Sequence, residues 1–468
     1  MGKIVLAFIL ISSFFSSVYA QGQAKTLSLN SFLEIVRKNH PVIRQAAIQI
    51  ELAEANLLKS KSGFEPTLNS AYAEKTFGEN NYYNDFNSEL NIPTWFGIEM
   101  YAGLNNLTGN KISSVATPDQ SNYIGASIPL LKNLLMDERR ATLKQSKLYN
   151  EMSVVERQTI VNDLLMESID SYYNWMKAYE LNKVLEDNLD YSQKRMDFIR
   201  RSFSNGEYSE IDTVEAFTQL QSFQISKIEA GINLMKSVFQ LSIFSWKENN
   251  EPVELPLDIS PESSLDNSDI SNQFDFVLEN LIVDLDNHPE LKKYDLKQDV
   301  LTVDKQLKQQ SLLPKLDLYY NFLGKDYDVR KTFSNHQYLT DNYQYGIKFE
   351  LPLLLMKGRA DFRIAKLKLE QNSIDYKYKQ FELNLKVKSY YNEYALLKNQ
   401  LVLQKSMFEN YKKLVDAEEQ KLLNGESSMF MINSRQMKAL DALEKLVKLQ
   451  AKYYKTIYAV MWSTGRLQ

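Results

Sequence analysis

The sequence contains no cysteine, and it has only three histidines among its 468 residues. Without cysteine the chain cannot form disulfides or carry a lipid on a thiol, so we expect a protein that is not lipid-anchored. So few histidines, with no phosphate-binding loop and no metal-ligand spacing, leave no nucleophile–base pair. The sequence therefore argues against an enzyme, and we expect neither a cofactor nor a bound metal.

Long apolar runs are also absent after the N-terminus, so no helix is expected to cross a membrane. Residues 1–20 have a lysine near the start, an apolar stretch and small residues at the end, which predicts a signal peptide removed before Gln21. An exported protein of this kind is either soluble or a β-barrel. The net charge of −4 argues against nucleic acid as a partner.

The sequence indicates an internal duplication, because the tripeptide Asn-His-Pro occurs at 39–41 and again at 287–289. In each half a second proline follows at the same distance, and a long segment later ends in Asn-Gly-Glu. The predicted organisation, in order, is a first repeat over 21–250, a linker over 251–272 and a second repeat over 273–468.

The two repeated histidines, His40 and His288, invite a metal-site hypothesis, but zinc would need further ligands that no spacing here supplies. Pro41 and Pro289 suit the first turn of a helix, and the preceding asparagines are expected to be N-caps. We interpret both histidines as repeat-boundary residues.

Glycine and proline are missing between Pro129 and Gly206, and between Gly358 and Gly425. Each stretch predicts a helix of about 100 Å at about 1.5 Å per residue. Apolar residues repeat at a spacing near 3.5, interrupted by Glu418, which is typical of coiled coils. Each Asn-Gly-Glu is then a turn, and the expected elements are antiparallel helical hairpins over about 132–246 and 356–464.

Short segments with alternating apolar and polar residues predict strands over about 67–128 in the first repeat and about 316–351 in the second. Two strands are expected in the second repeat, and two or three in the first, over 67–77, 92–105 and 121–128. The alternation favours a lipid-facing barrel with a wet interior by a small margin, because a half-buried soluble sheet alternates in the same way. Four strands from each of three chains would give twelve, the first count that encloses a useful channel.

The chain resembles the TolC family of outer-membrane factors over about residues 25–465. The resemblance rests on the duplication, on the passage from a strand through "PLL" and "RRA" (Pro129 to Ala141) into a long helix, and on the Asn-Gly turns. It implies a mainly α fold with a small β part. Three chains would form an α-helical tunnel through the periplasm, joined to a twelve-stranded transmembrane β-barrel in the outer membrane, with the linker around the tunnel's equator.

The same resemblance implies a function and its partners. The homotrimer would be a passive duct for tripartite efflux or type I secretion, working with a periplasmic adaptor (membrane fusion protein), an inner-membrane transporter and outer-membrane lipid. The alternative from a different class is a periplasmic coiled-coil scaffold or adaptor without a pore. Resistance of the protein to salt or carbonate extraction from membranes would separate the two.

Members of the family often carry acidic residues just after the hairpin turns, where they line a closed periplasmic gate. Asp212 and Glu215 match such positions, or are simply the solvated first turn of a helix. Met431 and Ser434 occupy the equivalent second-half positions, so an acidic ring does not carry over there. Arg435 is a candidate partner for Asp212 or Glu215 of a neighbouring hairpin. The candidate adaptor contacts are Asn205, Gly206, Glu207, Asn424, Gly425 and Glu426.

Overall fold

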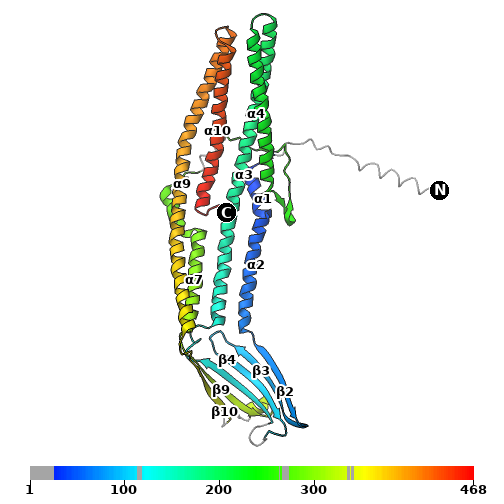
Figure 1. Cartoon of the computed structure of the whole chain (residues 1–468), viewed down its shortest axis with the longest axis vertical. Coiled ribbons are helices and arrows are strands. Elements are labelled where there is room, and N and C mark those ends of the chain that lie inside the picture. The colour runs from blue at the N-terminus through cyan, green and yellow to red at the C-terminus, as the bar shows by residue number, and fades with distance from the viewer. Residues whose placement is uncertain are drawn as a thin grey trace, which may run out of the picture. The chain divides into compact units, whose positions relative to one another are not determined.

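The computed structural model describes residues 26–112, 119–262, 264–265, 274–334, 338 and 342–467 (Figure 1). The expected signal peptide lies outside these residues. The contacts form two compact units, and each draws on both halves of the chain. The helical unit comprises 1–43, 161–278 and 387–468, and the sheet unit comprises 44–160 and 279–386.

The order of elements is the same in both halves: short helices, strands, then a long helical hairpin. The long helices α3 (Glu138–Ser204) and α9 (Met356–Leu423) run unbroken for 67 and 68 residues, as the scarcity of glycine and proline predicts. Their returning partners are α4 (Glu210–Ser242) and α10 (Met429–Ser463). The shorter helices are α1 (Leu29–Asn39), α2 (Pro41–Lys61), α6 (Leu278–Val283), α7 (Pro289–Gln310) and α8 (Val329–Ser334). Among the described residues, no helix combines the length and the apolar character needed to cross a membrane.

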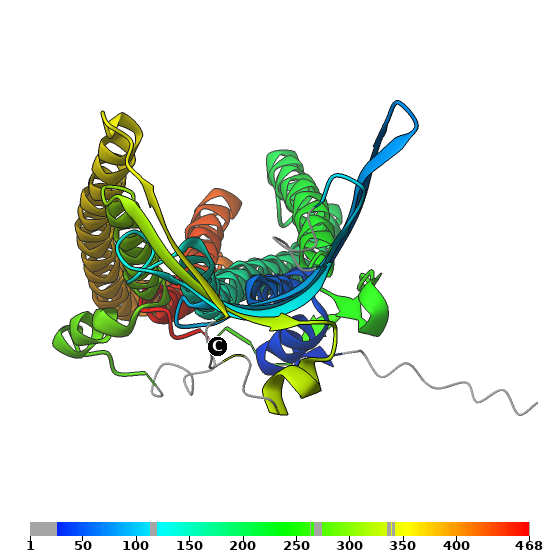
Figure 2. The same ribbon diagram turned by 90° about the horizontal axis from the view of Figure 1, so that it is seen from below.

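The sheet unit contains one six-stranded antiparallel sheet in the order β10-β9-β5-β4-β3-β2 (Figure 2). The first half supplies four of these strands and the second half two, so the expectation of four strands per chain is wrong. The strands are β2 (Thr67–Phe77), β3 (Asn80–Pro93), β4 (Glu99–Thr108), β5 (Gln120–Pro129), β9 (Lys315–Lys325) and β10 (Tyr343–Glu350). Short two-residue strands pair elsewhere: β1 (Thr26–Leu27) with β8 (Ser260–Pro261), and β6 (Trp246–Lys247) with β7 (Glu251–Pro252).

Strand β3 is the element that the sequence analysis missed. Its sequence, NNYYNDFNSELNIP, is rich in asparagine and aspartate, which are depleted in strands. Alternation is nevertheless present, because the register places Phe86, Leu90 and Ile92 on the same face. The tertiary pairing with β2 and β4 therefore overrides a weak local propensity.

The register confirms the predicted alternation and gives the sheet one apolar face. Ile347 pairs with Leu318 and Tyr345 with Tyr320, and the same face continues across the sheet to Leu68 on β2. Ile347 is 65% exposed and Leu68 is 70% exposed. The rest of the described chain leaves these side chains uncovered.

The opposite face is polar, and it brings tyrosines directly opposite glycines of the next strand. Tyr123 pairs with Gly103, Tyr101 with Gly125, and Tyr319 with Gly346. A Cβ atom at any of these three glycines would overlap the tyrosine ring across from it. Each glycine thus makes room for the tyrosine ring. The ring in turn covers the glycine backbone, which would otherwise be exposed to solvent.

The core of the helical unit is aromatic and joins α1, α3 and α10. Phe32 stacks on Tyr172 at 5.8 Å, and Tyr173 stacks on Tyr454 at 5.7 Å between ring centroids. Trp175 is completely buried beside them. The apolar repeat of the sequence is therefore helix-packing surface, as the coiled-coil interpretation requires.

The two repeated histidines cap helices, and the prediction of asparagine N-caps is wrong. His288 is the N-cap of α7, and its Nδ1 accepts from the Glu290 N–H at 3.1 Å. His40 likewise accepts from the Val42 N–H at 3.3 Å. Proline occupies the first helical position, so the residue directly before it must be the cap.

Candidate functional site at the hairpin tips

Helices α3 and α4 meet in a tight turn at Gly206. This residue has a φ of 80°, a left-handed conformation that glycine adopts without strain. Its N–H donates to the Phe203 carbonyl at 3.0 Å, and the Glu207 N–H donates to the Ser202 carbonyl at 3.0 Å. These two bonds form a Schellman motif that ends α3, and the predicted turn at 205–207 is confirmed.

The second hairpin repeats this turn between α9 and α10. Gly425 has a φ of 77°, its N–H donates to the Leu422 carbonyl at 3.1 Å, and the Glu426 N–H donates to the Lys421 carbonyl at 2.8 Å. The side chains of both turns are exposed: Asn205, Glu207, Asn424 and Glu426. The two tips therefore present the same backbone shape and a similar polar surface.

The hairpins differ where the returning helix begins. The Asp212 carboxylate accepts from the Ser209 N–H at 3.1 Å and from the Ser209 hydroxyl at 2.6 Å, within a capping box that starts α4. In α10 the corresponding position is Met431, whose N–H reaches the Ser428 hydroxyl at 3.4 Å. Asp212 is thus engaged in the start of its own helix.

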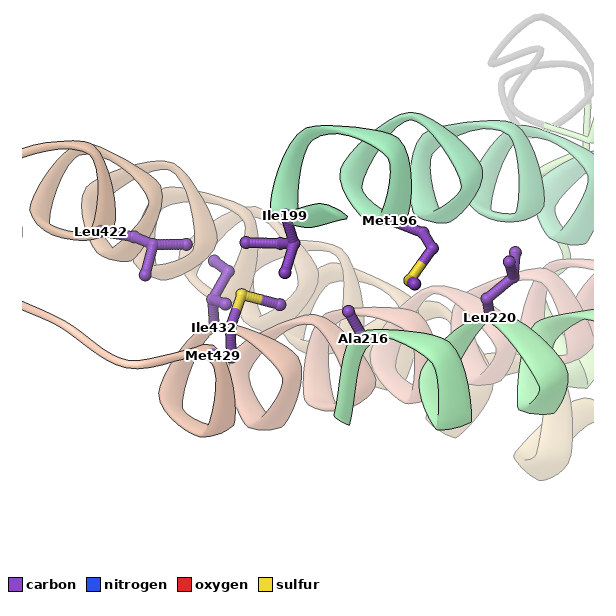
Figure 3. Close-up of a cluster of buried hydrophobic side chains, with 7 residues drawn as sticks. All are labelled: Met196, Ile199, Ala216, Leu220, Leu422, Met429 and Ile432. Atoms are coloured by element: carbon purple, nitrogen blue, oxygen red, sulfur yellow. The ribbon is translucent and has the colours of Figure 1, made fainter. Parts of the chain in front are cut away.

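An apolar cluster holds the two hairpins together below the turns (Figure 3). It takes side chains from all four helices, and Ile199, Met429 and Ile432 in it are completely buried. The full set is Met196 and Ile199 of α3, Ala216 and Leu220 of α4, Leu422 of α9, and Met429 and Ile432 of α10. Separation of the hairpins would expose this cluster to water at a cost of about 25 cal/mol for each Å² of apolar surface.

A buried arginine lies beside the apolar cluster and links α3 to the second hairpin. Arg195 donates through Nη1 to the Gln436 amide oxygen at 2.5 Å and to the Asn433 amide oxygen at 3.4 Å. Its guanidinium lies over the Tyr191 ring, 4.7 Å from the centroid. The side chain is 10% exposed, and burial lowers the pKa of Arg195 to about 10.

The carboxylate nearest to Arg195 belongs to Glu419 of α9. Arg195 Nη2 and Glu419 Oε1 are 3.9 Å apart, and the Tyr191 hydroxyl donates to the same carboxylate. Burial raises the pKa of Glu419, because an ion pair of this length does not offset the loss of water. Arg195 is therefore a desolvated cation, and its nearest carboxylate, which is 40% exposed, compensates it only weakly.

Arg435 pairs within its own hairpin and not with the predicted acidic residues of this chain. Its Nε lies 3.6 Å from a Glu418 carboxylate oxygen, and the Ser427 hydroxyl donates to Glu418 at 2.6 Å. The Ser427 hydrogen bond, with help from nearby cations, holds the pKa of Glu418 below its usual range. Glu215 instead accepts from the Asn433 amide at 3.3 Å, which links the two hairpins.

The structure thus places Glu215 in a contact between the hairpins and Arg435 in a contact within the second hairpin, and it leaves Ser434 half-buried. The sequence analysis missed Arg195, which contacts Glu419 and Gln436 from the other half of the chain. The one available signal was Glu418, which interrupts the apolar repeat. In the described part of the chain, no three His, Asp or Glu side chains are arranged to hold a metal ion.

A sequence model of the outer membrane efflux protein family matches residues 32–242 and 284–466. No curated protein sequence gives a significant match.

Solved structures of outer-membrane channels share the fold over almost the full chain at low identity. CusC is 12% identical, with a TM-score of 0.69 over 96% of this chain and 95% of that chain. The Campylobacter jejuni CmeC outer membrane channel is 15% identical, with a TM-score of 0.65 over 94% of this chain and 85% of that chain. The Neisseria gonorrhoeae MtrE outer membrane channel, solved in its open state, is 13% identical, with a TM-score of 0.64 over 94% of this chain and 89% of that chain.

The two segments matched by the family model contain the six strands of the large sheet, both hairpins and the tip residues described above. They make up most of the sequence, and the chain belongs to the outer membrane efflux protein family.

Proposed function

We propose that three copies of this chain form a passive outer-membrane duct for efflux or type I secretion. The duct would receive substrates from an inner-membrane transporter and a periplasmic adaptor. The observation that carries the proposal is the six-stranded sheet, whose apolar face is exposed and whose outer strands β2 and β10 each have one neighbour. Open sheet edges are not tolerated in lipid, so the sheets of several copies must close on one another.

The strand count changes the expected size of the barrel. Six strands from each of three copies give eighteen, and barrels of 16 to 18 strands leave a water-filled interior. The polar face, with its asparagines, tyrosines and glycines, suits the lining of that interior.

The hairpin tips are proposed as the periplasmic gate and as the adaptor contact. In the closed form the apolar cluster and the Arg195 contacts hold the first hairpin against the second. Opening must break these contacts, and a weakly compensated Arg195–Glu419 pair regains water when it separates. The exposed turn residues at 205–207 and 424–426 are the surface that an adaptor would meet first.

Single-channel conductance in planar bilayers tests both parts of this proposal. We expect the wild-type protein to show a low resting conductance, and Arg195→Ala to raise it because the link to Gln436 is lost. Arg200→Ala is the matched control, since Arg200 is an exposed residue on the same helix. Equal conductance of wild type and Arg195→Ala would remove the gate from the proposal, and absence of any conductance from both proteins would rule out the duct.

A further inference from the structure

One edge of the sheet carries a group of exposed apolar side chains. This edge is the end of the sheet where the strands join the helices, and its four connecting segments together are called the collar (Figure 1). The segments are the β3–β4 turn, the connection from β5 to α3, the connection from α7 to β9 and the connection from β10 to α9 (residues 93–99, 129–138, 311–315 and 350–356). Trp95 is 76% exposed, Leu135 76% and Leu353 89%. Leu131, Leu354 and Met356 are exposed beside them.

Hydrogen bonds fix the backbone of the collar segment 129–138. Leu130 N–H donates to the Leu316 carbonyl at 2.8 Å, and Lys132 N–H donates to the Pro314 carbonyl at 3.2 Å. Arg140 donates to the Asn133 carbonyl at 2.5 Å and is paired with Asp137. Apolar side chains fixed in contact with water are costly, and an exposed cluster of them marks an interaction surface.

A second copy of the chain does not account for the whole collar. Copies that join through the outer strands would cover side chains next to β2 and β10. Trp95 lies in the turn between β3 and β4, and Leu131 and Leu135 follow β5, so all three belong to inner strands of the sheet. Whatever covers the collar must therefore contact the segments next to the inner strands as well as the segment that follows β10.

Lysines lie next to these leucines in a cleft of about 540 Å³. Lys132, Lys308 and Lys357 line it together with Glu138, Asp361 and Met356. None of the three lysines forms an ion pair with another described residue. Lysine is a strong ligand for phosphate groups, acting as a compact positive charge.

We propose that the collar docks into the phospholipid leaflet at the point where the sheet leaves the membrane. The apolar side chains lie among acyl chains, and the lysine cleft binds the phosphate of a glycerophospholipid headgroup. This inference rests on the proposed membrane function, because it continues the exposed apolar face of the sheet into the loops. Long lysine side chains beside apolar surface are suited to such a boundary.

Fluorescence quenching in vesicles tests the apolar part. The full-length protein is reconstituted into phosphatidylcholine vesicles whose acyl chains carry bromine near the headgroup. We expect bromine to quench the emission of the wild-type protein and to have much less effect on Trp95→Phe, because the other three tryptophans, Trp175, Trp246 and Trp462, belong to the helical unit and not to the collar. Quenching that is equal in the two proteins, with the protein floating with the vesicles, would overturn the collar while leaving the membrane function intact. Failure to float at all would reject the membrane function itself.

Lipid retention tests the lysine cleft. Detergent-purified protein is mixed with phosphatidylglycerol, and bound lipid is counted by native mass spectrometry. The triple variant K132Q/K308Q/K357Q is expected to bind at least about tenfold more weakly, since a charge-assisted hydrogen bond exceeds the free energy of one factor of ten. The corresponding three Lys→Arg changes should restore binding, and Lys111→Gln, an exposed lysine at the far edge of the sheet, should leave it unchanged.

The outcomes of this second experiment are also decisive. Retention that is the same in the triple variant and the wild type overturns the phosphate site. Retention that falls equally with Lys111→Gln shows general attraction to charge and overturns it too. Binding of free inorganic phosphate by a protein that retains no lipid would show that the cleft recognises phosphate without the leaflet, which contradicts the proposed docking.

Discussion

On the polar face of the sheet, individual side chains fit closely against glycines of the neighbouring strand. Tyr101 lies over Gly125, and the Asn321 side chain also approaches that glycine. Any side chain at Gly125 must displace one of these two neighbours, and both are held by the strand register.

Gly125→Val is expected to lower the stability of the sheet by about 1–3 kcal/mol, the usual cost of overpacking. The thermal midpoint of the detergent-purified protein, followed by circular dichroism, measures this loss. Ala71→Val is the control, because Ala71 faces the same side on the outer strand β2 and is exposed. Equal midpoints for the two variants would contradict the close fit.

His288 makes the stability of the sheet unit sensitive to acid. Burial lowers its pKa to about 4, so the folded protein binds fewer protons than the unfolded chain between about pH 6.5 and 4. The stabilisation is complete above pH 6.5 and is lost as the pH falls through this window, by up to about 3 kcal/mol. His288→Asn keeps a capping side chain that does not titrate.

We therefore expect the thermal midpoint of His288→Asn to fall less between pH 7 and pH 5 than that of the wild type. Measurement at both pH values separates this effect from a general loss of stability, which would lower both midpoints equally. A pH dependence identical to that of the wild type would show that His288 does not set it.

The residues of the hairpin tips were only partly predictable from the sequence, because some of them contact residues that are far away along the chain. Glu215 and Arg435 follow recognisable turns, so their positions could be proposed from spacing. Arg195 contacts Gln436 and Glu419 from the other half of the chain, and no local pattern marks a residue whose partners are that remote.

At the scale of elements, the two returning helices start with caps of unequal quality. Helix α4 has the reciprocal Ser209–Asp212 box, whereas α10 has Ser428 with Met431 in the acidic position. The difference predicts that the second tip frays more easily than the first.

Met431→Asp should complete the box and stabilise the start of α10 by about 0.5–1 kcal/mol. Hydrogen exchange of the amides at 429–433, measured by mass spectrometry, is expected to slow in this variant. Met437→Asp, at another exposed methionine of the same helix, is a control that should not slow it. Unchanged exchange in Met431→Asp would contradict the cap.

Long helices and turns were the most predictable elements, because the absence of glycine and proline and the two Asn-Gly-Glu turns act locally. Strand β3 was not predicted, because asparagine-rich sequence forms a strand there only through its neighbours on both sides. The histidine caps were misassigned by one residue, since the fixed φ of proline places the cap directly before it.

At the scale of the whole molecule, the exposed apolar face must meet lipid for the proposed duct to assemble. Ile347→Lys places a charge on that face, at an expected cost of about 2–4 kcal/mol near the middle of a bilayer. Gln344→Lys places the same charge on the polar face of the same strand. We expect the first variant, and not the second, to fail to integrate into outer membranes, as measured by resistance to carbonate extraction.

The directions of the two edge strands also limit the symmetry that the proposed assembly of several copies can have. The edge strand β2 comes from the first half and runs away from the helices, and the edge strand β10 comes from the second half and returns to them. With all helices on one side of the membrane, β2 of one copy can continue the antiparallel sheet only by meeting β10 of the next. Every junction is then heterologous, so the copies must close head-to-tail in a ring with one rotation axis, and a two-fold dimer through like edges is excluded.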